Sequence, residues 1–147
     1  MEPGSAPKEP GRALGVDLGS RRVGLALTDR RRIISSPHAT IPMKSEPSLV
    51  EELVTLCQRQ GVTMVVVGLP VSADGTEGPG CARARRITAA LRRQGLEVRL
   101  QDECWSSRDA EDILRQTGKT RRTSKEKIDA IAASLILRDY LQEASRP

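Results

Sequence analysis

Hydrophobic and polar positions in the first third of the chain predict three antiparallel strands. Residues 12–18 (RALGVDL) are mostly apolar, as in a strand that is covered on both faces. After a Gly-Ser turn signal, apolar residues recur with period two over 23–27, which predicts a second strand paired with the first as a hairpin. Residues 32–41 are compatible with a third strand that ends before Pro42.

The pattern then changes to alternating helices and strands. Ser48 and Glu51 form a capping box for a helix that ends near Gly61, and the continuous apolar run 62–70 is typical of a central parallel strand. The further predicted elements are a loop over 71–80, a helix over 81–94, a strand over 97–103, a short helix over 106–116, a basic loop over 117–123, and a helix from a second capping box at Thr123 and Glu126 to Gln142. This order predicts an α/β domain with a mixed sheet and helices on its faces.

Length and composition predict one folded domain in a reducing compartment. The 147 residues suit a single domain over 12–142, with loose tails at 1–11 and 143–147. The first ten residues contain no apolar stretch of the kind found in signal peptides, and no run approaches the length of a membrane span. The three cysteines show no CxxC spacing, which favours free thiols. We therefore expect a cytoplasmic protein with no membrane partner.

The charge of the chain is compatible with a polyanionic partner. Lys and Arg total 24 against 19 Asp and Glu, and the basic surplus lies between Cys81 and Lys127. Arginine dominates, and its planar guanidinium suits phosphate oxygens. A solvated basic surface is an equally good explanation of charge alone. Because aromatic residues make up only 1 % of the chain, base stacking cannot be the main mode of nucleic-acid binding.

Asp17 is the first candidate for chemistry. It is an ionisable residue near the end of an apolar strand, where burial of a lone carboxylate is costly. A bound cation or facing backbone amides would compensate, and Gly19 leaves room for a metal ion or phosphate to approach. The alternative is a carboxylate that only caps the following turn.

A second acidic position follows a later strand, at Asp102 and Glu103. Consecutive strand residues point to opposite faces, so only one of the two can join Asp17. Asp102 shares its face with the apolar residues Val98 and Leu100. Because both faces of such a sheet are covered, this alternation does not decide between the two acids.

Asp129 lies early in the last predicted helix, on the same side as Ala133 and Ile136. This position directs its carboxylate toward the sheet, although a simple interaction with the helix dipole would also explain it. Carboxylates from two strand ends and one helix start are ligands that Mg²⁺ and Mn²⁺ prefer. With His38 as the only histidine, a zinc site of Cys and His ligands is disfavoured.

Taken together, these residues resemble the YqgF family, also called RuvX, a family of pre-16S rRNA nucleases. The resemblance covers residues 12–142 and is carried by four stretches: LGVDLGSRRVGLALTD (14–29), VVVGLPVSADGTEGPGCARAR (65–85), LQDECWSSRDAEDIL (100–114) and KEKIDAIAASLIL (125–137). It implies a ribonuclease H-like fold and three catalytic, metal-binding acids at Asp17, Glu103 and Asp129, which selects Glu103 over Asp102. It also implies processing of the 5′ end of the small-subunit rRNA precursor, with junction-resolving activity proposed for some members.

One position departs from the family pattern. The family usually has arginine directly after the Asp-Glu pair, whereas this chain has Cys104. A guanidinium there could hold the scissile phosphate, and a cysteine cannot supply that charge. Arg108, Lys125 or the basic stretch 119–122 could compensate.

The hypothesis from the sequence is a nuclease dependent on Mg²⁺ or Mn²⁺ that acts on structured RNA. The residues expected to grip the nucleic-acid backbone are Arg21, Arg22, Arg108, Lys119, Arg121, Arg122 and Lys125. Two alternatives stay open, namely a resolvase of four-way DNA junctions and a catalytically silent RNA-binding or transcription factor. The first acidic stretch also resembles the phosphate loop of sugar kinases and actin-like ATPases, but those proteins use two related domains and 147 residues supply one.

Overall fold

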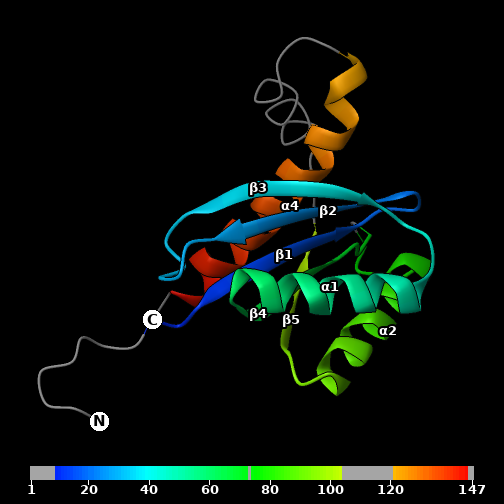
Figure 1. Ribbon diagram of the computed structural model, residues 1–147. Helices are drawn as coiled ribbons and strands as arrows, with labels where there is room; N and C mark the ends of the chain where they lie inside the picture. The colour runs from blue at the N-terminus through cyan, green and yellow to red at the C-terminus, as the bar shows by residue number, and fades with distance from the viewer. Residues whose placement is uncertain (1–8, 73, 104–120, 146–147) are drawn as a thin grey trace, which may run out of the picture.

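A five-stranded mixed sheet forms the centre of the protein (Figure 1). The computed structural model describes residues 9–72, 74–103 and 121–145, with side chains of the last range from Lys127 onward. The strands are β1 (Arg12–Leu18), β2 (Arg22–Thr28), β3 (Ser35–Pro42), β4 (Val62–Leu69) and β5 (Glu97–Asp102). Their order in the sheet is β3-β2-β1-β4-β5. β2 pairs antiparallel with both β1 and β3, and β4 pairs parallel with both β1 and β5.

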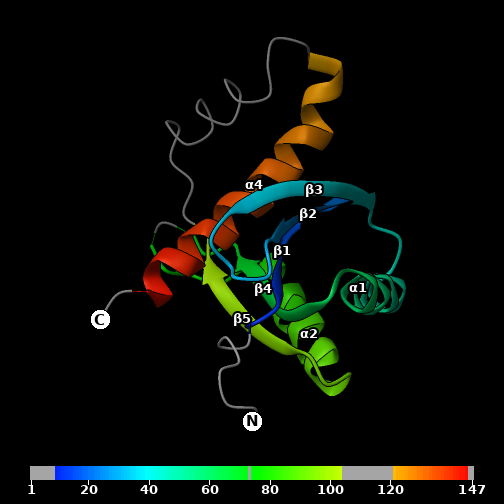
Figure 2. The ribbon, with the colours of Figure 1, turned by 60° about the vertical axis from the view of Figure 1, so that its left-hand side comes forward.

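Helices cover both faces of this sheet, as Figure 2 shows. Helices α1 (Glu46–Gln60) and α2 (Pro79–Arg93) pack on one face, against a core that includes Leu14, Val16 and Val65. Helix α4 (Arg121–Ala144) packs on the other face against a smaller core with Ala13, Met64 and Val66, while its first turns project beyond the sheet. The predicted mixed sheet with helices on its faces is confirmed.

The strands match the sequence prediction more closely than the helix starts do. β1, β2, β4 and β5 agree with the predicted ranges to within one residue, and the third strand begins three residues later than expected. That delay has a local cause, because the Asp29 carboxylate accepts hydrogen bonds from the backbone N–H groups of Ile33 and Ile34, both at 2.8 Å. These bonds hold the residues between Asp29 and Ile34 in a turn, so β3 begins only after it.

Both predicted capping boxes are wrong. The N-cap of α1 is Ser45, whose Oγ accepts a hydrogen bond from the Ser48 N–H at 3.2 Å, so Ser48 lies inside the helix. Helix α4 begins at Arg121, before the predicted cap at Thr123, so 121–123 belong to the helix and not to the predicted loop. In α1, a proline in the first turn favours the earlier start because it needs no hydrogen-bond acceptor there. The predicted helix over 106–116 and the residues 117–120 lie outside the described residues.

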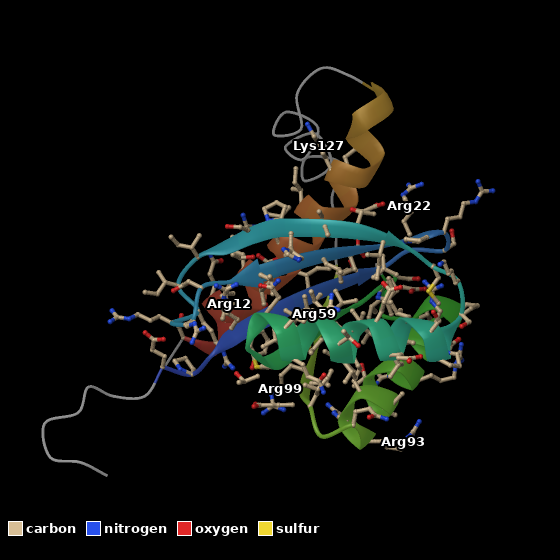
Figure 3. The ribbon with its side chains drawn as sticks, in the orientation of Figure 1. Arg12, Arg22, Arg59, Arg93, Arg99 and Lys127 are labelled. Atoms are coloured by element: carbon tan, nitrogen blue, oxygen red, sulfur yellow. The ribbon has the colours of Figure 1, made fainter. Side chains whose placement is uncertain are left out.

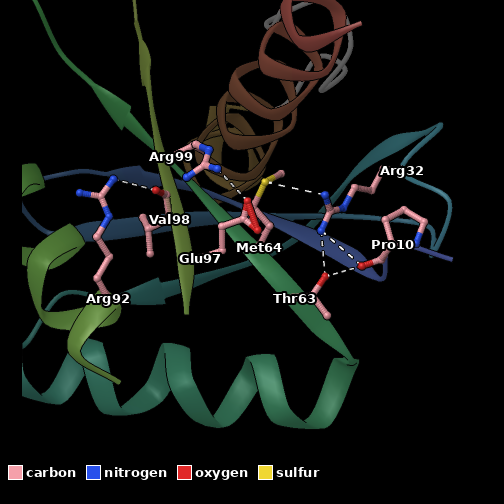
Figure 4. A network of polar contacts seen from close by, with 8 residues as sticks. All are labelled: Pro10, Arg32, Thr63, Met64, Arg92, Glu97, Val98 and Arg99. Atoms are coloured by element: carbon pink, nitrogen blue, oxygen red, sulfur yellow. Dashed lines mark hydrogen bonds and ion pairs between the residues drawn. The ribbon is translucent and has the colours of Figure 1, made fainter. Parts of the chain in front are cut away.

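A clamp centred on Arg32 joins the β2–β3 turn to the start of β4 (Figure 4). Its guanidinium donates hydrogen bonds to Thr63 Oγ1 at 2.8 Å and to the Gly11 carbonyl at 2.9 Å. Arg32 itself has a positive φ of 58°, which few non-glycine residues adopt. The clamp lies at the amino end of β4, whereas the predicted acidic residues lie at the opposite end of the sheet. No helix among the described residues has the length and apolar character needed to cross a bilayer.

Candidate active site at the carboxyl ends of three parallel strands

The sheet topology brings the predicted acidic residues to one end of the molecule. β1, β4 and β5 run parallel, so their carboxyl ends meet at the same edge. Asp17 is the penultimate residue of β1 and lies opposite Gly24 of β2. Leu14 and Val16 face the core under α1 and α2, so Asp17 belongs to the opposite face, which α4 covers. Its side chain is partly buried there.

Glu103 reaches toward Asp17 across the intervening strand. Its backbone N–H donates to the Leu69 carbonyl at 2.9 Å, which fixes Glu103 beside the end of β4. A Cβ atom at Gly68 would lie only 2.6 Å from the Glu103 Cδ atom, so the Glu103 side chain passes directly over this glycine. Because Gly68 has no side chain, β4 leaves a passage between β5 and β1.

Helix α4 brings Asp129 to the same face. The helix sits so close to β2 that a Cβ atom at Gly24 would collide with the Asp129 backbone carbonyl. One strand further along, a Cβ atom at Gly15 would lie 2.6 Å from the Ala133 carbonyl oxygen. Two glycines in adjacent strands therefore set the height of α4 above the sheet and place Asp129 next to the end of β1.

The three acidic side chains interact electrostatically. Burial raises the pKa of the Asp17 carboxyl above its ordinary value, hydrogen bonding with the Glu103 side chain acts in the opposite direction, and the negative charge of Asp129 raises the pKa further. Asp17 therefore lies within electrostatic reach of both other acids. A cation at this position would relieve both the burial cost and the repulsion.

Asp129 is engaged with an arginine in this arrangement. Arg22 Nε donates to Asp129 Oδ2 at 2.7 Å, and the two side chains are 36 % and 24 % exposed. Within the part of the chain that the structure describes, no group of three or more His, Cys, Asp or Glu side chains is arranged to hold a metal ion directly. The acids are thus neighbours, but Asp129 is directed to Arg22.

Of the predicted nucleic-acid contacts, two lie among the described side chains. Arg21 is exposed in the β1–β2 turn, whereas Arg22 carries the ion pair to Asp129. Figure 3 labels Arg22 at the end of the sheet from which the first turns of α4 project, and the exposed Lys127 lies on these turns. Arg108 and Lys119 lie outside the described residues, as do the side chains of Arg121, Arg122 and Lys125. Cys104, at the departure from the family pattern, also lies outside them.

Arg83 is a site residue that the sequence analysis missed. It comes from α2, on the face opposite α4, and its Nη2 donates to the carbonyls of Gly19 at 2.7 Å and Leu18 at 3.1 Å. Its Nε is buried without a hydrogen-bond partner among the described residues. Arg83 thus holds the backbone directly after Asp17. Its place in the CARAR stretch of the resemblance was the only signal in the sequence.

The strand order, the helices on both faces and the acidic residues at the carboxyl ends of the parallel strands define a domain of the ribonuclease H-like fold. The chain belongs to the RuvX family, described as Holliday junction resolvase, which it matches over residues 11–143. Relatives that carry the provisional name pre-16S rRNA nuclease are similar over nearly their entire length. One from Chloroflexus aggregans is 38 % identical over 135 residues, covering 91 % of this chain and 95 % of its own. One from Anaeromyxobacter sp. (strain K) is 40 % identical over 134 residues, covering 88 % and 96 %.

Solved structures support the fold assignment. The structure of Thermus thermophilus RuvC aligns with a TM-score of 0.59 at 13 % identity, covering 91 % of this chain and 97 % of RuvC. The fowlpox virus resolvase, solved in complex with Holliday junction DNA, aligns with a TM-score of 0.55 at 12 % identity, covering 92 % and 99 %. At this low identity the likeness concerns the architecture alone.

Proposed function

We propose that this protein is a cytoplasmic, metal-dependent nuclease that hydrolyses a phosphodiester bond in precursor 16S rRNA. The observation that carries the proposal is the approach of Asp17, Glu103 and Asp129 at one end of the sheet. Family membership supports it, because relatives of 34–40 % identity are named for this substrate. The family model matches residues 11–143, the range in which Asp17, Glu103 and Asp129 lie.

The donor set fits a hard divalent cation. Three carboxyl groups on the α4 face offer oxygen ligands, and a bound cation would offset the burial and the Asp129 charge that raise the pKa of the Asp17 carboxyl. Bound Mg²⁺ or Mn²⁺ would supply a nucleophile from water at neutral pH and stabilise the charge that develops on the phosphate. The only histidine, His38, lies on β3 at an exposed position and is not one of these groups.

The chain's own residues would hold the cation, position the end of β1 and contact the RNA. Asp17, Glu103 and Asp129 would hold the cation, and Arg83 would keep the strand end that bears Asp17 in place through the Leu18 and Gly19 carbonyls. Arg21 is exposed beside this end and would contact the RNA backbone by charge. The other proposed contacts to structured RNA are Arg108, Lys119, Arg121, Arg122 and Lys125.

A side-by-side cleavage assay tests the substrate. A 5′-extended 16S rRNA fragment and a synthetic four-way DNA junction are incubated with the protein and Mn²⁺. The proposal predicts cleavage of the RNA in preference to the junction. The family description and the fold neighbours make the junction the second candidate, and preferential cleavage of the junction would replace the first.

A pair of adjacent acids supplies the matched control for the site. Glu103→Gln should lower the cleavage rate by about 100-fold or more, which corresponds to roughly 2.7 kcal/mol of transition-state stabilisation. Asp102→Asn should leave the rate within about twofold, because Asp102 is exposed and belongs to the opposite face. Equal losses in both variants would argue against the assignment of Glu103.

A further inference from the structure

The ion pair between Arg22 and Asp129 joins two residues that are far apart in the sequence. Arg22 is the first residue of β2, and Asp129 lies within α4. The 2.7 Å contact from Nε to Oδ2 is a charge-assisted hydrogen bond with good geometry. Both side chains are only partly exposed, so the pair is shielded more than one on the open surface.

The backbone around this pair leaves little room for rearrangement. At Gly24 the β2 backbone meets the Asp129 carbonyl directly, and at Gly15 the β1 backbone meets α4 one turn later. The Asp129 main chain is therefore fixed relative to the sheet. Any change in what the Asp129 carboxylate contacts must come from rotation of its side chain or from movement of Arg22.

The same pair gives one of the three neighbouring acids a basic partner. Asp17 interacts with the Glu103 side chain through a hydrogen bond and with Asp129 through charge. Asp129, however, directs one carboxylate oxygen to Arg22. Among the described residues, no three His, Cys, Asp or Glu side chains are placed to hold a metal ion together. The Arg22 guanidinium thus pairs with the Asp129 carboxylate, which would be the third metal ligand.

We propose that Arg22 is an internal competitor for the divalent cation, a guanidinium that neutralises Asp129 in the metal-free protein and must release it when the cation binds. This inference rests on the proposed function. It assigns Arg22 a role in setting metal affinity, in addition to any contact with RNA, and distinguishes it from its exposed neighbour Arg21.

Direct measurement of Mn²⁺ binding by calorimetry, with no RNA present, tests the competition. Arg22→Gln removes the competitor and should tighten Mn²⁺ binding about three- to fivefold relative to Arg21→Gln, the range expected for a partly exposed ion pair. Arg21→Gln is the matched control because it removes the same charge from the adjacent exposed position. Arg22→Lys should stay near the wild type, since an ammonium group can still pair with Asp129. Equal affinities of the two Gln variants, or weaker binding by Arg22→Gln, would overturn the proposal.

A second measurement uses the wild-type protein and avoids any question of variant folding. The NMR signal of the Arg22 Nε–H group is followed during titration with Mg²⁺, with the Arg21 signal as the internal control. Release from Asp129 predicts a change of the Arg22 signal that saturates together with metal binding. An unchanged Arg22 signal at saturating Mg²⁺ would contradict release.

The outcomes also separate this inference from the proposed function. If the wild type binds Mn²⁺ and Asp17→Asn does not, while Arg22→Gln behaves as Arg21→Gln does, only the competition is refuted. If the wild type binds no Mn²⁺ at all, the metal-dependent function and the competition fail together.

Discussion

The Asp17 carboxyl is costly to bury in the folded protein and is also a proposed metal ligand. Its carboxyl is partly buried beside two other acids, and its pKa is raised chiefly by that burial. Groups in such environments are frequently retained for function at the expense of stability. The same carboxyl should therefore weaken the metal-free fold and support the metal-bound one.

Replacement of Asp17 by Asn should abolish cleavage and yet stabilise the metal-free protein. We expect the free energy of unfolding at neutral pH, measured in a chelator, to rise by about 1 kcal/mol, because a neutral amide avoids the burial cost and the repulsion from Asp129.

The difference in unfolding free energy between Asp17→Asn and the wild type should depend on pH in one direction. A raised pKa in the folded state favours the protonated acid, so the stability contributed by Asp17 is fully present below the ordinary value of 3.8 and is lost as pH rises through the folded-state pKa. The difference in unfolding free energy between Asp17→Asn and the wild type should thus become smaller as the pH falls toward 3.8. An Asp17→Asn protein that unfolds more easily than the wild type at neutral pH would contradict this account.

Gly68 controls whether Glu103 can reach Asp17. A Cβ atom there would lie 2.6 Å from Glu103 Cδ and 2.7 Å from Ile136 Cδ1, and both atoms are ends of flexible side chains. Gly68→Ala should therefore cost no more than about 1 kcal/mol in stability while it lowers the cleavage rate about tenfold or more by displacing Glu103. Thermal unfolding and a cleavage assay on the same preparation measure both quantities. Unchanged activity would mean that the passage over Gly68 is not needed.

The sequence singled out acidic residues that lie at one end of the sheet, but it did not give their geometry. Alternation along β5 correctly grouped Asp102 with Val98 and Leu100, which face α1 and α2. It could not decide between Asp102 and Glu103 because the face of Asp17 was unknown, and that face depends on which helices cover each side of the sheet. Arg83 was missed for a related reason, since its partners are backbone carbonyls 64 and 65 residues away.

Helix α4 is positioned by glycines of the sheet. The spacing along the helix placed Asp129 on the same side as Ala133 and Ile136, and both of these residues are buried. The close approach to Gly24 and Gly15 was not predictable, because neither glycine lies in a turn or at a positive φ that would mark it. The capping box predicted for α1 failed because the motif is short and another polar residue, Ser45, lies one turn earlier.

Gly24→Ala should separate α4 from the sheet. Its new methyl group would collide with the Asp129 backbone carbonyl, which cannot turn aside as a side chain can. We expect a loss of about 3 kcal/mol in the free energy of unfolding, together with loss of cleavage as Asp129 moves. Gly78→Ala is the control, because a Cβ atom there would meet open space, and the cost of alanine at the N-cap of α2 should stay below about 1 kcal/mol. Similar stabilities of the two variants would show that α4 does not depend on this contact.

The molecule as a whole gathers its chemistry at one end of the sheet. Parallel β1, β4 and β5 finish there, and the first turns of α4 leave the sheet near the same end, where Arg22 also lies (Figures 1 and 3). The opposite end is closed by the Arg32 clamp. The order of elements along the chain predicted a mixed sheet with helices on its faces, because three strands followed by alternating helices and strands permit few right-handed arrangements.

We propose that Asp17, Glu103 and Asp129 jointly hold the divalent cation with which this protein cleaves RNA. The most direct test is a Mn²⁺-titrated cleavage assay on the 5′-extended 16S rRNA fragment, comparing the wild type with Asp17→Asn. The wild type should be inactive in a chelator and gain activity that saturates with Mn²⁺, while Asp17→Asn should remain at least about 100-fold slower at every concentration. Cleavage that persists in the chelator, or that survives in Asp17→Asn, would contradict the claim.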